Sequence, residues 1–213
     1  MDSDFWHKRW QNNELGWHEG DVNGLLAAHF DDWASAGGQR VFLPLCGKTR
    51  DIAWLLSAGH RVAGIELSRA AVEQLFAELG VEPVISRHGD LEHFQAEGID
   101  IFAGDLFELS AQALGPLDVV YDRAALVALP DGMRDRYSAY LMELTGRAPQ
   151  FLLCFEYDQR EMDGPPFSVT GDEVRRHYGE HYDVQLIASR EVDGGLKGIC
   201  AATEIAWSLQ SPD

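Results

Sequence analysis

The amino-acid sequence predicts an α/β fold built on a mostly parallel β-sheet with helices on both faces. Apolar, strand-like runs at Val41–Leu45 and Arg61–Glu66 are each followed by a helix-like pattern, and a turn at Cys46-Gly47-Lys48 ends the first run. Strands that alternate with helices in this way are typical of right-handed parallel sheets. Such sheets bind ligands beyond the carboxyl ends of their strands, so we expect the functional site near these two strand ends.

The other elements follow from the same kind of pattern. Helix-like patterns run from Val22 to Trp33, from Thr49 to Leu56, from Ser68 to Leu79, from Met133 to Leu144 and near Gly171–Tyr178. Further strand-like segments are Val84–Arg87, Glu92–Gln95, Ile99–Ala103, Leu117–Tyr121, Gln150–Tyr157, Asp183–Arg190 and Gly198–Ser208. The first two of these segments predict a small hairpin insertion. The last two predict an antiparallel pair, because no helix pattern separates them.

Size and charge narrow the class of protein. The chain has 213 residues, with 17 Lys or Arg against 35 Asp or Glu, for a net charge of −18. Nucleic acids and anionic membranes bind clustered Lys and Arg, so we expect neither as a partner. The length predicts a single domain, residues 1–213. Three cysteines without a CxxC pair, a polar N-terminus and the lack of a long apolar run predict a reduced, cytoplasmic protein.

The glycine turn and the next strand together predict a cofactor that contains a ribose. Glu66 ends the second strand, and a carboxylate in this order after a glycine turn is typical of ribose-binding sites. A phosphate-binding loop needs a glycine where Phe42 stands, and a dinucleotide site needs a GxGxxG run, whereas Gly47 stands alone. S-adenosylmethionine has a ribose and no pyrophosphate, so it fits both observations. The alternative is that Glu66 is an ordinary exposed carboxylate.

Two other charged residues come directly after predicted strands. Asp105 is placed for the adenine side of such a cofactor, but it could equally cap the turn that begins at Leu106. Arg123 has a planar guanidinium that suits an anionic group of a ligand, and the alternative is an ion pair with Asp122. The sequence leaves both pairs of alternatives open.

Other chemistries have weaker support in the sequence. Cys46 has no residue near it that looks like its base, which favours packing in the turn over a nucleophile. His177 and His181 are spaced as ligands on one helix face, but Gly179 lies between them and no third ligand is recognisable. We therefore predict no metal site. A GxSxG elbow of a serine hydrolase is also missing from the sequence.

The first 20 residues contain three of the six tryptophans, Trp6, Trp10 and Trp17, in a stretch without a clean period. One interpretation is an arm that large rings hold against the surface. The other interpretation is a lid whose aromatic side chains close over a bound ligand.

Several long motifs, in order, resemble the thiopurine S-methyltransferase family. They are FLPLCGKTRDIAWL, GIELS around Glu66, YDRAALVALP from Tyr121, EYD at Glu156–Asp158 and GPPFSV at Gly164–Val169. The resemblance runs from Trp6 to about Trp207 and implies a Rossmann-like, seven-stranded methyltransferase sheet whose last strand is antiparallel. It also implies that S-adenosylmethionine is the methyl donor and S-adenosylhomocysteine the product.

The resemblance assigns roles to particular positions. Residues that match the family's cofactor site are Trp10, Leu45, Glu66, Asp105, Leu106 and Arg123, with Asp105 and Leu106 on the adenine side. Trp17 matches an aromatic residue that faces the acceptor, which favours the lid interpretation. Arg123 is the expected catalytic residue and also a substrate contact, because it orients either the anionic acceptor or the methionine carboxylate.

The resemblance implies an S-methyltransferase that acts on thiopurines or related aromatic and heterocyclic thiols. We expect a monomer that uses no metal and whose partner is a small-molecule thiol or another soft nucleophile. The first alternative is a related methyltransferase that acts on tellurite, selenium compounds, halide or thiocyanate. The second is a non-catalytic nucleotide-binding module, and an oxidoreductase is disfavoured by the missing GxGxxG run.

Overall fold

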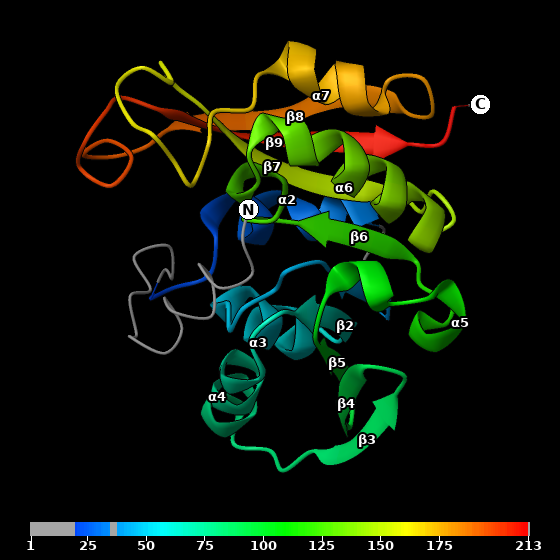
Figure 1. Cartoon of the computed structure of the whole chain (residues 1–213). Coiled ribbons are helices and arrows are strands. Elements are labelled where there is room, and N and C mark those ends of the chain that lie inside the picture. Colours follow the sequence, from blue (N-terminus) through cyan, green and yellow to red (C-terminus); the bar gives the residue numbers. More distant parts are fainter. Residues whose placement is uncertain (1–19, 35–37, 213) are drawn as a thin grey trace. The chain divides into compact units, whose positions relative to one another are not determined.

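The structure is a computed structural model that describes residues 20–34 and 38–212 (Figure 1). The backbone divides into two units, Met1–Val119 and Val120–Asp213, and each unit is described by itself. The expected single domain over residues 1–213 stays a prediction. Within the described part of the chain, no helix is long and apolar enough to cross a membrane.

The first unit is built on five strands. They are β1 (Arg40–Leu43), β2 (Arg61–Glu66), β3 (Val84–His88), β4 (Leu91–Ala96) and β5 (Ile99–Ala103), in the order β3-β4-β5-β2-β1. Strand β2 runs parallel to both β1 and β5, whereas β4 runs antiparallel to β3 and to β5. Because β1, β2 and β5 run in the same direction, their carboxyl ends meet at one edge of the sheet, where ligands of such folds collect.

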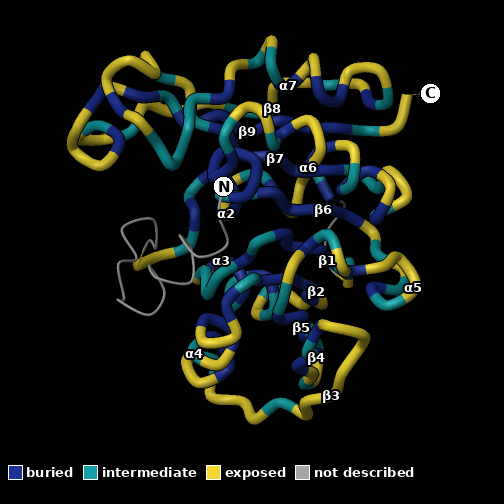
Figure 2. The backbone as a smooth tube through the Cα atoms, in the orientation of Figure 1, coloured by how far each residue is buried: buried dark blue, intermediate teal, exposed yellow. Residues whose placement is uncertain are grey.

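In the first unit, α2 precedes β1, and the other helices follow strands β1, β2 and β5. The helices are α2 (Gly24–Ala34), α3 (Arg50–Ser57), α4 (Arg69–Leu79), the short 3-10 turn η1 (Leu106–Glu108) and α5 (Ala111–Leu114). The Thr49 hydroxyl accepts from the Asp51 amide at the start of α3, and the Ser68 hydroxyl accepts from the Ala71 amide at the start of α4. Strands β1 and β2 are mostly buried, whereas β3 is exposed along its whole length (Figure 2).

The second unit carries four strands and two longer helices. They are β6 (Val119–Asp122), η2 (Leu126–Ala128), α6 (Asp131–Leu144), β7 (Gln150–Glu156), α7 (Gly171–Tyr178), β8 (Asp183–Glu191) and β9 (Thr203–Gln210). The strand order is β6-β7-β9-β8, with β6 parallel to β7 and with β9 antiparallel to both of its neighbours. Asp122 pairs with Leu152, so β7 continues past the end of β6 and the loop after β6 lies beside its last residues.

Much of this organisation confirms the expectations from the sequence. Strands β2 and β5 and helix α7 have the predicted bounds, and the hairpin and the antiparallel last pair are both present. Strand β6 lies one to two residues later than predicted. Strand β9 begins at Thr203 rather than Gly198, because the Leu196 amide donates to the Cys200 carbonyl and closes a separate turn.

The expected sheet of seven mostly parallel strands is wrong in its details. Nine strands are described, five in the first unit and four in the second, and their pairing is mixed. The two strands of the hairpin account for the difference. Strand β4 buries Leu91, His93 and Phe94 and pairs along the full length of β5, so the predicted insertion extends the sheet.

Candidate functional site

The turn after β1 contains two residues with positive φ, and it places backbone amides at the carboxyl end of the strand. Leu45 has φ 46° and Gly47 has φ 54°, both in the left-handed region that L-residues with side chains seldom adopt. Between them, the Cys46 amide donates to the Ile65 carbonyl at 3.0 Å, which ties the turn to β2. A non-glycine residue in this conformation is strained, and Leu45 is one of the predicted cofactor residues.

Glu66 joins the ends of β1 and β2 through its side chain. One carboxylate oxygen accepts from the Gly47 amide at 2.9 Å, and the other accepts from the Ser68 amide at 2.8 Å. The side chain is buried, with 6% of the residue exposed, so the alternative of an ordinary exposed carboxylate is wrong. The Glu66 carbonyl also accepts from the Gly104 amide at 2.9 Å, which brings the end of β5 to the same place.

Burial raises the pKa values of the two titratable groups at the ends of β1 and β2, Glu66 and Cys46. Loss of water raises the pKa of Glu66 to about 7, although the backbone amides of Ser68 and Gly47 favour the charged carboxylate. The same burial, with the Glu66 charge as a second cause, raises the pKa of the Cys46 thiol well above its usual value. A thiol that resists ionisation is a poor nucleophile, so the geometry favours the packing role for Cys46.

Asp105 and Leu106 follow β5 at this edge. The Asp105 carboxylate accepts from the Phe107 amide at 3.0 Å and so caps η1. This is the contact expected if Asp105 caps the turn that begins at Leu106. Asp105 is exposed and Leu106 is buried. Both residues closely follow Gly104, whose amide donates to the Glu66 carbonyl at the end of β2. Their expected role on the adenine side of the cofactor stays a prediction.

Arg123 lies in the second unit, directly after β6, and is half-buried. The neighbouring Asp122 is fully buried and accepts from the Tyr137 hydroxyl at 2.7 Å and from the Leu126 amide at 3.2 Å. Burial raises the pKa of Asp122 to about 6. Asp122 is thus bonded to α6 and to the start of η2, so the chain is held at the residue directly before the loop that carries Arg123.

The predicted site residues fall into three groups. Leu45, Glu66, Asp105 and Leu106 come together in the first unit, and Arg123 belongs to the second unit. Trp10 and Trp17, and the whole of the predicted arm or lid, lie outside the described residues. Tyr137 was not recognised from the sequence, because its spacing in α6 is that of a core aromatic. Ser68 was recognised only as a helix cap, although its amide also bonds Glu66.

The described residues bring together no group of three or more His, Cys, Asp or Glu side chains that could hold a metal ion. His177, one of the two histidines considered in the sequence, is enclosed by Asp135 and Glu173.

Comparison with known proteins places the chain in a family. Residues 1–205 match the family described as Thiopurine S-methyltransferase. The chain is 57% identical over 211 residues to a thiopurine S-methyltransferase of Xanthobacter autotrophicus, with 99% of each chain covered. It is 47% identical to the corresponding protein of Teredinibacter turnerae, covering 98% of this chain and 97% of the relative.

Solved structures show the same fold at low sequence identity. A SAM-dependent methyltransferase from Anabaena variabilis matches with a TM-score of 0.64 and 15% identity, covering 100% of this chain and 96% of that one. A Burkholderia thailandensis 1,6-didemethyltoxoflavin-N1-methyltransferase, solved with S-adenosylhomocysteine, matches with a TM-score of 0.67 and 17% identity, covering 98% and 87%.

The fold is therefore the α/β fold of the S-adenosylmethionine-dependent methyltransferases. The chain belongs to the thiopurine S-methyltransferase family. The expected class of enzyme, a methyltransferase whose donor is S-adenosylmethionine, is confirmed by this membership.

The raised pKa of Glu66 predicts a specific dependence of stability on pH. Its proton is bound more tightly in the folded chain, so the resulting stabilisation is complete below pH 4.5 and is lost as pH rises through about 7. Relative to Glu66→Gln, the wild-type unfolding free energy should fall by about 2–3 kcal/mol between pH 5 and pH 8. Urea unfolding at several pH values measures this difference. Glu66→Gln also lowers the unfolding free energy because its amide group lies beside two N–H donors, but a glutamine does not titrate and this loss is the same at every pH.

Glu78→Gln is the matched control, since Glu78 pairs with Lys48 at the surface of the same unit. A wild-type-minus-Glu66→Gln difference that stays constant from pH 5 to pH 8 would show that Glu66 ionises normally.

Proposed function

We propose that this protein binds S-adenosylmethionine at the carboxyl ends of β1, β2 and β5 and methylates the sulfur of thiopurines or related heterocyclic thiols. The observation that carries the donor site is the buried Glu66 carboxylate, held between the Gly47 and Ser68 amides. The family to which the chain belongs supports the thiol acceptor.

Glu66 has unused capacity for a ribose. A carboxylate offers about four lone-pair positions; the Ser68 and Gly47 amides occupy one on each oxygen and the Leu67 amide is a further donor, so room remains for a hydroxyl donor of a diol. Because the diol donates to the charged form, donor binding favours ionised Glu66. Leu45, in the turn after β1, is assigned to the donor, and Asp105 and Leu106 are assigned to its adenine side. Trp10 is assigned to the same cofactor.

The bound donor supplies an electrophilic methyl group on a sulfonium, which an acceptor sulfur attacks in line. A heterocyclic thiol presents sulfur as an anion near neutral pH, so the chain does not need a dedicated base. Its task is to orient the acceptor and to exclude water. We assign the orientation to Arg123, whose planar fork suits a delocalised anion, and the enclosure of the acceptor to Trp17.

A product assay tests the acceptor class. S-adenosylmethionine is supplied with 6-mercaptopurine, simple thiols, selenols, tellurite, iodide and thiocyanate, and S-adenosylhomocysteine is measured. We expect the heterocyclic thiol to give the largest kcat/KM, because its sulfur is ionised and its ring is delocalised. Faster turnover of tellurite, selenium compounds or iodide would replace the thiol proposal with the related methyltransferase. Donor binding without product from any acceptor would indicate a non-catalytic binding module.

Glu66→Ala tests the donor site. Loss of a charged hydrogen-bond acceptor costs about 1.5–3 kcal/mol, so S-adenosylhomocysteine binding should weaken by roughly 10- to 150-fold. Titration calorimetry on the folded variant measures the change, with Glu78→Ala as the control for loss of a nearby surface carboxylate. Wild-type affinity in folded Glu66→Ala would remove Glu66 from the donor site.

Arg123→Lys tests the anion-orienting role. The variant keeps the charge and loses the fork, so kcat/KM for 6-mercaptopurine should fall on the order of 10-fold, and further for Arg123→Ala. A rise in acceptor KM at constant donor affinity assigns Arg123 to the acceptor. Weaker S-adenosylhomocysteine binding assigns it to the methionine carboxylate. Wild-type turnover in both variants would reduce Arg123 to a structural role.

A further inference from the structure

Three loops of the second unit are joined near the carboxyl ends of β6 and β7. The loop after β6 (residues 123–129) carries Arg123, and the loop after β7 (residues 157–170) contains the Gly164–Val169 turn. The Phe167 amide donates to the Val127 carbonyl at 2.6 Å, which links these two loops. The Lys197 ammonium donates to the Pro165 carbonyl at 2.6 Å and brings in the loop between β8 and β9.

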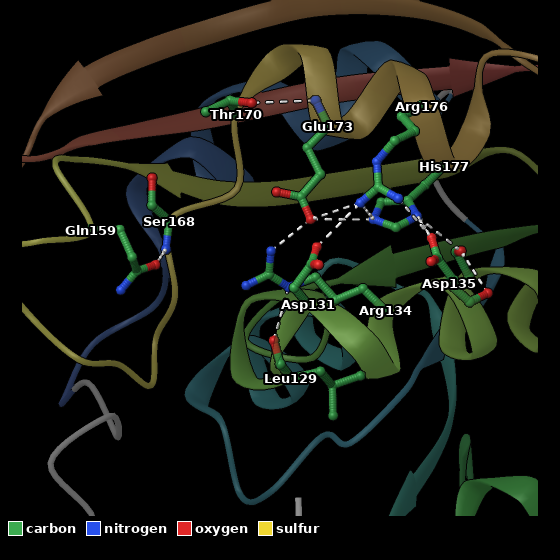
Figure 3. Close-up of polar contacts among 11 residues, drawn as sticks. Leu129, Asp131, Arg134, Asp135, Gln159, Ser168, Thr170, Glu173, Arg176 and His177 are labelled. Carbon is green, nitrogen blue, oxygen red and sulfur yellow. Dashed lines mark hydrogen bonds and ion pairs between the residues drawn. The ribbon is translucent and has the colours of Figure 1, made fainter.

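Arg134 of α6 contacts both linked loops, and Figure 3 shows its bonds to Leu129 and Glu173. Its Nε donates to the Leu129 carbonyl at 2.8 Å, at the end of the Arg123 loop. Its guanidinium carbon lies 5.5 Å from the centre of the Phe167 ring, in the turn after β7. Its Nη1 donates to Glu173 of α7 at 2.6 Å. The side chain is only 4% exposed, so these contacts form away from water.

The partners of Arg134 are themselves fixed. The Glu173 amide donates to the Thr170 hydroxyl at the start of α7, and the same Glu173 carboxylate lies 3.3 Å from His177 Nε2. At the other end of the Arg123 loop, the Tyr137 hydroxyl bonds Asp122. Arg134 and Tyr137 are neighbours on one face of α6, three residues apart. Helix α6 therefore holds the Arg123 loop at both of its ends.

A lysine could not make the same set of contacts. The guanidinium is planar, donates from Nε and Nη1 in different directions, and presents a flat face to the aromatic ring. A lysine ammonium is a single strongly hydrated point charge, and it would give up either the Leu129 carbonyl or Glu173. The arrangement thus depends on the shape of arginine as well as on its charge.

We propose that Arg134 is a positioning residue for the acceptor side of the site, because it fixes the Arg123 loop and the Gly164–Val169 turn relative to each other. This inference rests on the proposed function, which places the acceptor at Arg123. Arg134 contacts loop backbone, an aromatic face and Glu173, so it acts through Arg123 and the turn rather than on the acceptor itself.

Arg176 is the matched control. It lies on α7 and bonds Asp131 and Asp135 of α6, so it joins the same two helices as Arg134. Its side chain is 50% exposed, and its contacts within the described residues, which include Glu173 and His177 of its own helix, reach neither the Arg123 loop nor the turn after β7. A residue that only holds α6 to α7 should behave like Arg176.

The test compares Arg134→Lys with Arg176→Lys. We measure kcat and KM for 6-mercaptopurine, titrate S-adenosylhomocysteine by calorimetry, and follow amide hydrogen exchange of residues 123–129 and 164–169. For Arg134→Lys we expect kcat/KM for the acceptor to fall about 10-fold, with S-adenosylhomocysteine affinity within twofold of wild type. Amide exchange in both loops should become at least 10-fold faster. Arg176→Lys should stay within twofold of wild type in all three measurements.

Phe167→Leu is a second variant that leaves every charge in place, in case Arg134→Lys does not fold. It should reproduce the acceptor-specific loss, because it removes the aromatic face that Arg134 contacts. Wild-type acceptor kinetics and exchange in folded Arg134→Lys, or an equal loss in Arg176→Lys, would overturn the proposal. If wild-type enzyme methylates no thiol, the proposed function fails, and unchanged loop exchange in Arg134→Lys then separately refutes the positioning role.

Discussion

The first unit depends on one interaction, the buried Glu66 carboxylate that accepts from two backbone amides. Without it, the Gly47 amide and the Ser68 amide would each lose a charged partner in a place with little water. The contact also joins two segments that are far apart in the sequence, because the turn after β1 and the cap of α4 both donate to the same side chain. The strained φ at Leu45 is maintained by this closure and by the Cys46 bond to Ile65.

A second buried carboxylate repeats the arrangement in the other unit. Asp122 ends β6 as Glu66 ends β2, and it too accepts from a backbone amide of the segment that follows. Burial raises the pKa of both carboxyl groups toward neutrality, which is unfavourable for folding at neutral pH. Carboxylates retained at such a cost cluster at functional sites. In both units the carboxylate lies at the residue where the chain leaves the carboxyl end of a strand.

The sequence predicts the elements that local patterns determine, and it does not predict contacts between residues that are far apart in the sequence. Strand β2 and helix α7 are recognised because local apolar patterns and caps determine them, and Glu66 is recognised because a strand ends in a carboxylate. Arg134 and Tyr137 were not recognised. Except for Leu129, their partners lie 15 or more residues away in the sequence, and neither residue type at that position of a helix carries a local signal. The hairpin was recognised, but its pairing with β5 depends on an edge that only the folded sheet provides.

The negative charge of the whole chain makes the local environment of Arg123 and Arg134 important for binding an anion. With a net charge of −18, the protein would repel the anionic acceptor of the proposed function at long range. At physiological ionic strength this repulsion is screened over about 8 Å, so a few nearby side chains determine the potential that a bound acceptor meets. Arg134 is neutralised by Glu173, and the carboxylate next to Arg123 is bonded by Tyr137 and Leu126. Arg123 directly follows a carboxylate that is bonded by Tyr137 and Leu126, and the proposed function assigns its positive charge to a delocalised anion.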